Sequence, residues 1–338
     1  MTVSQQLTLT PREPDLWGAR VDELGLSLEV GPVAPLIARV RAELADKGLR
    51  FRPRFYVSNE WGCPDGQPLI GIPFYLVDAR MHAFEEEHAD DLEDDERILQ
   101  GIRHEMGHAV SYAYRLYATP EWEELFGPWA KDYDDDYVPA PFSARCIRHL
   151  PGWYAHKHPD EDFAETFAVW LTPGSAWRDR MPEGPVRRKL EYIDRVMREI
   201  ADQPPVIDPE SVIPDPDELN FTVGQFYRDR AIADAPPVHE LGSALDDDLR
   251  AMFTADGLGI DGSNLIHDRR KVIMRSVSGF TGSRLYVAKV LIDTLARRVR
   301  ELNLRAAHGK EVDAIIGVTA LASTLTRNFL QYRSFIPA

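Results

Sequence analysis

The sequence predicts an α+β fold with a small mixed sheet, one long helix beside it and a helical unit at the C-terminal end. Three observations lead to this prediction. Two segments rich in β-branched and aromatic residues lie between residues 51 and 77, a strongly amphipathic segment covers about residues 95–118, and helical apolar patterns fill the last 60 residues. The chain has 338 residues, of which 44% are hydrophobic, so one or two cores can be buried without disulfide bonds.

Each element follows from local signals. Apolar residues of the N-terminal helix recur at helical spacing and stop at Gly48, and turn-forming residues 62–66 separate the two strands. Pro73 has no N–H for a strand ladder, so we expect the second strand at a sheet edge. The predicted elements are a helix at residues 35–44, strands at 51–57 and 69–77, and helices at about 95–118, 159–171, 186–202, 283–304 and 311–332.

These elements divide the chain into four regions. Seven prolines occur in residues 203–240, which is typical of a linker or of a strap that crosses a surface. The expected regions are an N-terminal segment with one amphipathic helix at 1–50, a domain with both strands and the long helix at 51–202, the Pro-rich linker or strap at 203–240, and a C-terminal helical domain at 241–338.

Composition favours a soluble protein of a reducing compartment. The two cysteines, Cys63 and Cys146, have no Cys or His neighbours at the spacing of a structural zinc site. The N-terminus lacks the basic and apolar regions of a secretory signal, and no run of about 18 apolar residues occurs. We therefore expect a cytoplasmic protein with no membrane partner.

Charge is distributed unevenly around a net value of −16. From residue 264 onward there are 13 basic and 5 acidic residues, whereas the preceding part has 26 basic and 50 acidic residues. We expect the basic C-terminal helices to contact the acidic body, with an acidic partner for these helices as the alternative. The acidic body would repel phosphates, so we expect no nucleic-acid partner. The oligomeric state stays open.

The long helix contains His104-Glu105-Met106-Gly107-His108, an H-E-x-x-H pattern. Residues four positions apart share one helix face, so both imidazoles can bind a single metal ion. Glu105 lies beside them, where it can take a proton from a water molecule. Zn²⁺ accepts imidazole ligands, and a catalytic zinc site uses three protein ligands and keeps the fourth position open. The pattern therefore predicts a zinc centre that needs one further ligand.

The third ligand is expected on the helix at 159–171. A metzincin would have Gly and His where this chain has Ser111 and Tyr114, which excludes that class. Glu161 and Glu165 lie one turn apart on one face, while Phe163, Ala164, Phe167 and Leu171 supply the core contacts. We interpret Glu161 as the metal ligand and Glu165 as the acceptor for the N–H of a ligating histidine. The alternative is a simple acidic helix start, favoured by the helix dipole.

Together, the two motifs resemble the gluzincin metallopeptidases, and within them the lethal factor type and bacterial zinc-binding metallopeptidases. The resemblance covers about residues 95–172 and rests on H-E-x-G-H followed by E-x-F-A-E-x-F. It implies a zincin-like catalytic domain, with Glu161 as zinc ligand and Glu165 behind a ligating histidine. The lethal factor type also has a tyrosine seven positions before the ligand Glu. Tyr154 stands there, and the resemblance implies that it donates a hydrogen bond to the developing oxyanion.

Three histidines precede this motif and offer alternatives. His149, His156 and His158 lie in a loop-rich stretch, where solvated histidines are common. His156 or His158 could replace Tyr154 as oxyanion donor, and His158 is also an alternative metal ligand.

The sequence thus predicts a zinc-dependent peptidase that acts on a peptide or protein, with metal-activated water and Glu105 as general base. The strand at 69–77 is a candidate edge for binding an extended peptide. Two alternatives stay open: an exopeptidase or processing enzyme for one specific peptide, and a catalytically silent zincin that serves as a binding or regulatory module. Glu105 argues against the latter, since a structural metal site needs no general base.

Overall fold

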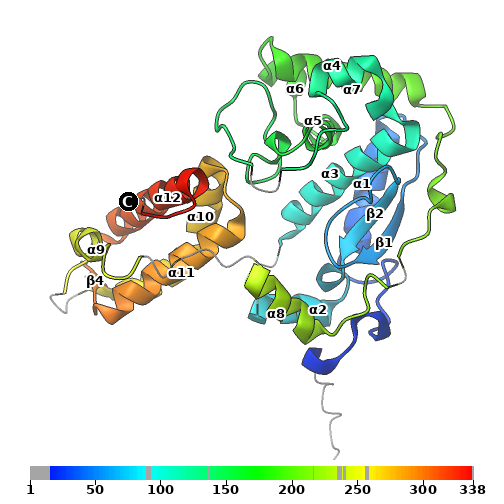
Figure 1. Ribbon diagram of the computed structural model, residues 1–338. Helices are drawn as coiled ribbons and strands as arrows, with labels where there is room; N and C mark the ends of the chain where they lie inside the picture. Colours follow the sequence, from blue (N-terminus) through cyan, green and yellow to red (C-terminus); the bar gives the residue numbers. More distant parts are fainter. Residues whose placement is uncertain are drawn as a thin grey trace, which may run out of the picture.

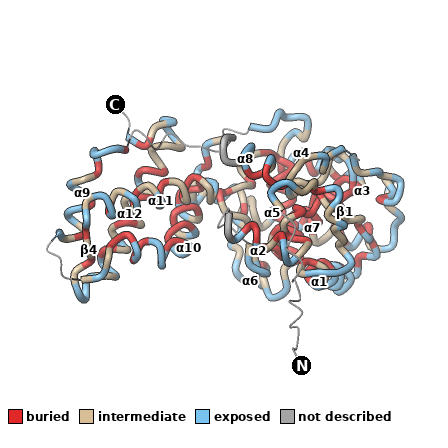
Figure 2. Tube along the Cα trace, turned by 90° about the horizontal axis from the view of Figure 1, so that it is seen from below, coloured by how far each residue is buried: buried red, intermediate tan, exposed pale blue. Residues whose placement is uncertain are grey.

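The computed structural model forms two bodies, mixed and mostly helical, that follow one another along the chain (Figure 1). A larger body comprises residues 16–233, and a C-terminal unit comprises residues 241–336. Each has its own apolar core, and Figure 2 shows buried residues gathered inside both. The structure describes residues 16–88, 93–134, 137–215, 217–233, 238, 241–255 and 259–336.

The elements of the larger body surround one long helix, α3. They are α1 (Ala34–Asp46), β1 (Arg54–Ser58), β2 (Leu69–Pro73), α2 (Ala79–His88), α3 (Asp95–Tyr114), α4 (Pro120–Phe126), α5 (Pro159–Leu171), α6 (Trp177–Arg180), α7 (Pro185–Ile200) and α8 (Val223–Ala233). The elements of the C-terminal unit are α9 (Asp246–Met252), β3 (Ile260–Asp261), α10 (Gly262–Thr281), α11 (Leu285–Glu301), β4 (Arg305–Ala306) and α12 (Glu311–Tyr332).

Helix α3 begins and ends on strong local signals. The Asp94 carboxylate accepts a hydrogen bond from the N–H of Arg97 at 3.0 Å and caps the first turn. The helix ends at Arg115, which adopts a left-handed conformation with φ of 52°. Between these ends nearly every side chain is buried, because α1, β2 and α5 all pack against α3. Residues of α1 therefore belong to the same core as the long helix.

Strand β2 is one of the two strands of its sheet, and an isolated bridge at Gly71 covers part of its other side. β1 and β2 pair in parallel, with Tyr56 opposite Gly71. On the other side, the N–H of Gly71 donates to the carbonyl of Gly62 at 2.8 Å. The predicted position of this strand at a sheet edge is therefore confirmed, and Gly62 bridges to that edge at Gly71. Pro73 is tolerated because it is the last residue of β2, where no further ladder N–H is needed.

The predicted helices and strands are present, but α10 was not predicted. Its buried apolar side chains include two groups, Leu265-Ile266 and Ile273-Met274, separated by a polar run that hides the periodicity, and Val277 follows one turn later. The two groups lie seven to nine residues apart, about two helical turns, so they share one face. α10 packs closely with α11 and α12. The short helices α2, α4, α6, α8 and α9 were not predicted either.

Residues 203–233 cross the surface of the larger body. The N–H groups of Val206 and Ile207 donate to the carbonyl of Ala113, at the end of α3. Further along, α8 packs with α2 in a small apolar cluster. Most of residues 234–240 lie outside the described residues. Among the described residues, no helix combines the length and the apolar character needed to cross a bilayer.

A buried ion pair joins α1 to α3 directly beside the H-E-x-x-H motif. The guanidinium of Arg103 contacts both carboxylate oxygens of Glu43, at 2.8 and 2.9 Å, and Arg103 is 1% exposed. Such a pair contributes little net stability compared with apolar residues, but removal of one partner leaves a charge buried without compensation.

Glu43→Leu is therefore expected to lower the free energy of unfolding by about 3–5 kcal/mol. The double variant Glu43→Leu/Arg103→Met removes both charges and should recover most of this loss. Urea unfolding of the metal-free protein measures both values. A loss below about 1 kcal/mol in the single variant would contradict a desolvated pair.

Candidate metal centre

Helices α3 and α5 bring His104, His108 and Glu161 to one point. The Nε2 atoms of the two histidines lie 3.1 Å apart, and the Glu161 Oε2 atom lies 3.0 Å from His104 Nε2 and 3.3 Å from His108 Nε2. All three side chains are buried, and together they form a group that could hold a metal ion. The predicted ligands are thus adjacent in space.

The spacing of these atoms fits a tetrahedral metal ion. Donors at about 2.0–2.1 Å from a zinc ion at tetrahedral angles lie about 3.3–3.4 Å apart. The three observed separations of 3.0–3.3 Å are close to this value. Two imidazole nitrogens facing each other at 3.1 Å also make a poor arrangement without a shared cation or proton. The donor set is therefore already assembled around one point.

Glu165 supports His104 from behind. Its Oε1 atom accepts a hydrogen bond from the His104 Nδ1 atom at 3.1 Å, which leaves Nε2 to face the centre. Glu165 is fully buried, and its carboxylate also accepts the backbone N–H groups of His149 and Leu150 at 2.8–3.1 Å. These hydrogen bonds compensate the buried charge. The structure places Glu165 where the sequence predicted it.

Asp160 lies behind His108 as Glu165 lies behind His104, and this role of Asp160 was not predicted from the sequence. Its Oδ2 atom lies 2.9 Å from His108 Nδ1 and accepts a hydrogen bond from the Tyr112 hydroxyl at 2.5 Å. The available signal was its position directly before Glu161, where a carboxylate is equally expected from the helix dipole. Each histidine thus has its own buried carboxylate.

The electrostatics of the metal-free cluster follow from this pairing. Burial lowers the pKa of His104, but hydrogen bonds to Glu161 and Glu165 outweigh burial and bring the pKa to about 9. Burial also opposes ionisation of Glu161, yet the two imidazoles hold the pKa of its carboxyl well below the ordinary value. Shared protons therefore balance the buried carboxylates, and a bound cation would take over this role.

Glu105 lies in the same cavity, which has a volume of about 350 Å³. Its Oε2 atom is buried and has no hydrogen-bond partner among the described residues. Burial raises the pKa of this carboxyl, and the negative charge of Glu161 acts in the same direction. The other residues that line the cavity are Trp61, Gly62, Cys63, Asp65, His104, His108, Tyr112, Tyr133, Tyr154, Lys157 and Glu161.

Tyr154 is the predicted oxyanion donor that reaches this cavity. Its ring centre lies 5.7 Å from that of His104, and Lys157 Nζ lies 5.5 Å from the Tyr154 ring centre. Burial raises the pKa of the phenol well above its ordinary value, and the charges of Glu161 and Glu105 add to this effect. The phenol therefore keeps its proton and can donate it in a hydrogen bond.

The three neighbouring histidines have structural roles. His158 caps α5, since its Nδ1 accepts the N–H of Asp160 at 3.1 Å while Nε2 donates to the carbonyl of Lys131 at 2.7 Å. Both nitrogens are therefore occupied away from the metal centre. His149 contacts the carbonyl of Gln100, and His156 Nδ1 accepts the N–H of Ala140. These three histidines do not line the cavity that contains the ligands.

Comparisons with known proteins give no relative. No protein-family model matches the chain, and neither a curated protein nor a solved structure does so. The site is therefore interpreted from its own geometry.

Gly107 allows α3 and α5 to approach closely enough to assemble the ligands. A Cβ atom at this position would meet Ala164 Cα at 2.9 Å and the Ala164 carbonyl oxygen at 3.2 Å, so backbone would have to move. Within α3, Gly101 offers a matched comparison. A Cβ there would meet only the Trp61 side chain, at 3.2 Å.

Gly107→Ala is expected to weaken metal binding at least about tenfold, because α5 and Glu161 must shift away from the histidines. Gly101→Ala should bind metal nearly as the wild type does, since a side chain moves more easily than a helix backbone. Competition with a chromophoric chelator measures both affinities. Equal affinity of Gly107→Ala and wild type would contradict a ligand set that depends on this helix contact.

Proposed function

We propose that the protein is a zinc-dependent peptidase that hydrolyses a peptide bond in a peptide or protein. The observation that carries this proposal is the combination, in one cavity, of an assembled three-residue ligand set and the Glu105 carboxylate, whose Oε2 atom has no hydrogen-bond partner among the described residues. A purely structural metal site needs neither the cavity nor a general base. The resemblance to gluzincin metallopeptidases supports the same activity.

The donor set favours zinc over other metals. Two neutral imidazoles and one carboxylate suit Zn²⁺, whereas Mg²⁺ and Ca²⁺ prefer all-oxygen sites. Three protein ligands also leave one position open towards the cavity. When bound there, zinc would polarise a substrate carbonyl and acidify a water molecule.

Glu105 and Tyr154 supply the remaining chemistry. We assign Glu105 as the general base that accepts a proton from the attacking water and returns it to the leaving amine. Burial raises the pKa of this carboxyl, and a raised pKa favours the transfer of a proton to it. We assign Tyr154 as the hydrogen-bond donor to the negatively charged oxygen that develops on the substrate carbonyl.

Residues 61–63 offer a backbone edge for the substrate. Gly62 uses its carbonyl to bind Gly71 of β2 in an isolated bridge. In an extended segment, the backbone groups of the two adjacent residues, here Trp61 and Cys63, point to the opposite side. All three residues line the cavity that contains Glu105. We infer that an extended peptide adds to this edge by main-chain hydrogen bonds and thereby crosses the metal centre.

Glu105→Gln is expected to retain the metal but lose peptide cleavage, by about 10²–10⁴-fold, because only the proton acceptor is removed. Cleavage of a diverse peptide mixture by both proteins, read by mass spectrometry, measures this difference. Chelation of the wild type should abolish the same cuts, and added zinc should restore them. If both proteins cut at the same sites and rates, the activity belongs to a contaminant. A zinc-loaded wild type that cuts nothing would favour the silent binding module.

Main-chain recognition predicts a distinctive response to backbone methylation. In a cleaved peptide, N-methylation of one amide at a time should raise KM at least about tenfold at alternate positions, because alternate residues face the edge. Alanine substitution at these positions, with the backbone unchanged, is the matched control. A uniform response along the peptide would exclude strand addition at residues 61–63.

A further inference from the structure

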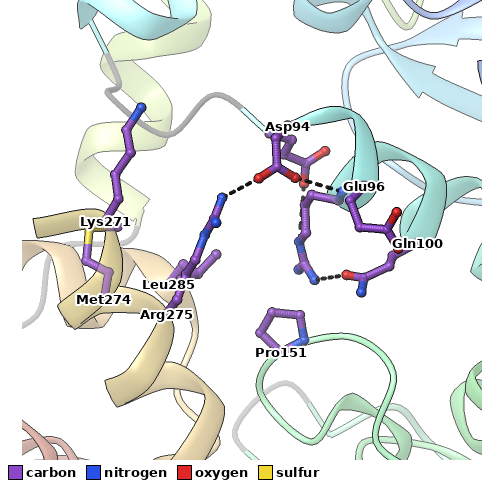
Figure 3. A pocket seen from close by; sticks show the side chains of 10 residues that line it. Asp94, Glu96, Gln100, Pro151, Lys271, Met274, Arg275 and Leu285 are labelled. Atoms are coloured by element: carbon purple, nitrogen blue, oxygen red, sulfur yellow. Dashed lines mark hydrogen bonds and ion pairs between the residues drawn. The ribbon is translucent and has the colours of Figure 1, made fainter.

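The C-terminal unit contacts the larger body at the start of α3. Arg275 of α10 forms an ion pair with Asp94 at 2.6 Å, and Lys271 lies 3.6 Å from Glu86 of α2. Figure 3 shows Arg275 reaching across to Asp94, with Pro151 of the larger body below them. A cavity of about 290 Å³ separates the two bodies here, so the surfaces are not fully packed at this contact.

A second contact joins residues 279–284, which are the last turn of α10 and the link to α11 and are here called the α10–α11 turn, to an irregular loop of the larger body, residues 137–153. The guanidinium of Arg148 donates to the carbonyl of Gly279 at 3.0 Å. Gly282, with φ of 84°, fits tightly against the loop: a Cβ atom there would lie 2.4 Å from Pro139 Cγ and 3.0 Å from the Trp153 ring. This contact depends on shape as well as on a hydrogen bond.

The loop at 137–153 leads directly to the metal centre. Its last residue, Trp153, adopts a left-handed conformation and is followed at once by Tyr154. The N–H groups of His149 and Leu150, within the loop, donate to Glu165. A displacement of the loop would therefore move the phenol of Tyr154 and the carboxylate that orients His104.

We propose that the C-terminal unit positions the active site, with Gly282 and Arg148 as positioning residues that hold the loop at 137–153 against the α10–α11 turn. The part of this proposal that concerns catalysis rests on the proposed function. The charge of Arg284, at the end of the turn, also acts on Tyr154: burial and the nearby carboxylates raise the pKa of the phenol, and Arg284 opposes them. The turn therefore lies within electrostatic reach of the oxyanion donor.

Gly282 and Gly309 make a matched pair for testing the proposal. Both have left-handed backbones, with φ of 84° and 78°, so an added methyl group strains both similarly. Only at Gly282 would the methyl group meet the larger body, because a Cβ at Gly309 faces open space. A second pair avoids backbone strain: Arg148→Gln removes the hydrogen bond to Gly279, whereas Arg145→Gln changes an exposed arginine of the same loop.

The hydrogen-exchange rates of the His149 and Leu150 amides report how firmly the loop is held, and their measurement requires no catalytic activity. In the metal-free protein, Gly282→Ala and Arg148→Gln should raise the exchange rate of these two amides at least about tenfold relative to Gly309→Ala and Arg145→Gln. Equal exchange within each pair overturns the proposal. If Gly282→Ala fails to fold, the comparison of Arg148→Gln with Arg145→Gln alone decides whether the C-terminal unit holds the loop.

A double-mutant cycle then tests the effect on catalysis. Arg148→Gln should lower kcat about tenfold in the wild-type background and leave kcat nearly unchanged in a Tyr154→Phe background, because both changes disturb one interaction. Independent, additive effects overturn positioning through Tyr154. If neither wild type nor Glu105→Gln cleaves peptides, the proposed function fails, and the exchange experiment still decides whether the C-terminal unit holds the loop.

Discussion

The structure depends on the close contact between α3 and α5 at Gly107. This contact sets the distance between the two histidines on one helix and Glu161 on the other, because a glycine lets the backbone of α5 reach the surface of α3. Since His104, His108 and Glu161 all lie on these two helices, the arrangement of the candidate metal ligands does not depend on loop conformation. The buried apolar core of the larger body holds both helices in place, so the site is as rigid as that core.

The close packing of α3 and α5 also concentrates several charged side chains in the buried interior. Besides the ligands, α5 buries Asp160, Asp162 and Glu165, and none of these carboxylates could remain in the core without partners. Asp162 contacts the ammonium group of Lys189 from α7 at 2.5 Å, and Glu165 is held by two backbone amides and His104. The charged groups on α5 are thus matched by partners on α3, on α7 and in the loop that precedes α5. The acidic first turn of α5 therefore organises the surrounding chain as well as the metal site.

Local signals made a large part of this site predictable. His104, His108, Glu161 and Glu165 could be placed from sequence because helical spacing alone decides which face each side chain occupies. The edge at residues 61–63 could not, since Gly62 lies in a turn-like segment and becomes a strand neighbour only by pairing with Gly71. α10 was missed for a related reason: its apolar groups make sense as one face only when α11 and α12 are present to cover them. Prediction failed where tertiary pairing, rather than local periodicity, determined the outcome.

Charge asymmetry explains less of the assembly than the sequence suggested. The basic C-terminal unit does contact acidic groups of the larger body, but Arg275 and Asp94 are more than half exposed, and such pairs contribute only about 0–1 kcal/mol. Salt also screens them. The contact of Gly282 with Pro139 and Trp153 excludes even a methyl group, so its geometry is far more specific. Opposite charges would therefore steer the two bodies together, whereas the shape of the α10–α11 turn would determine how they meet and where Tyr154 lies.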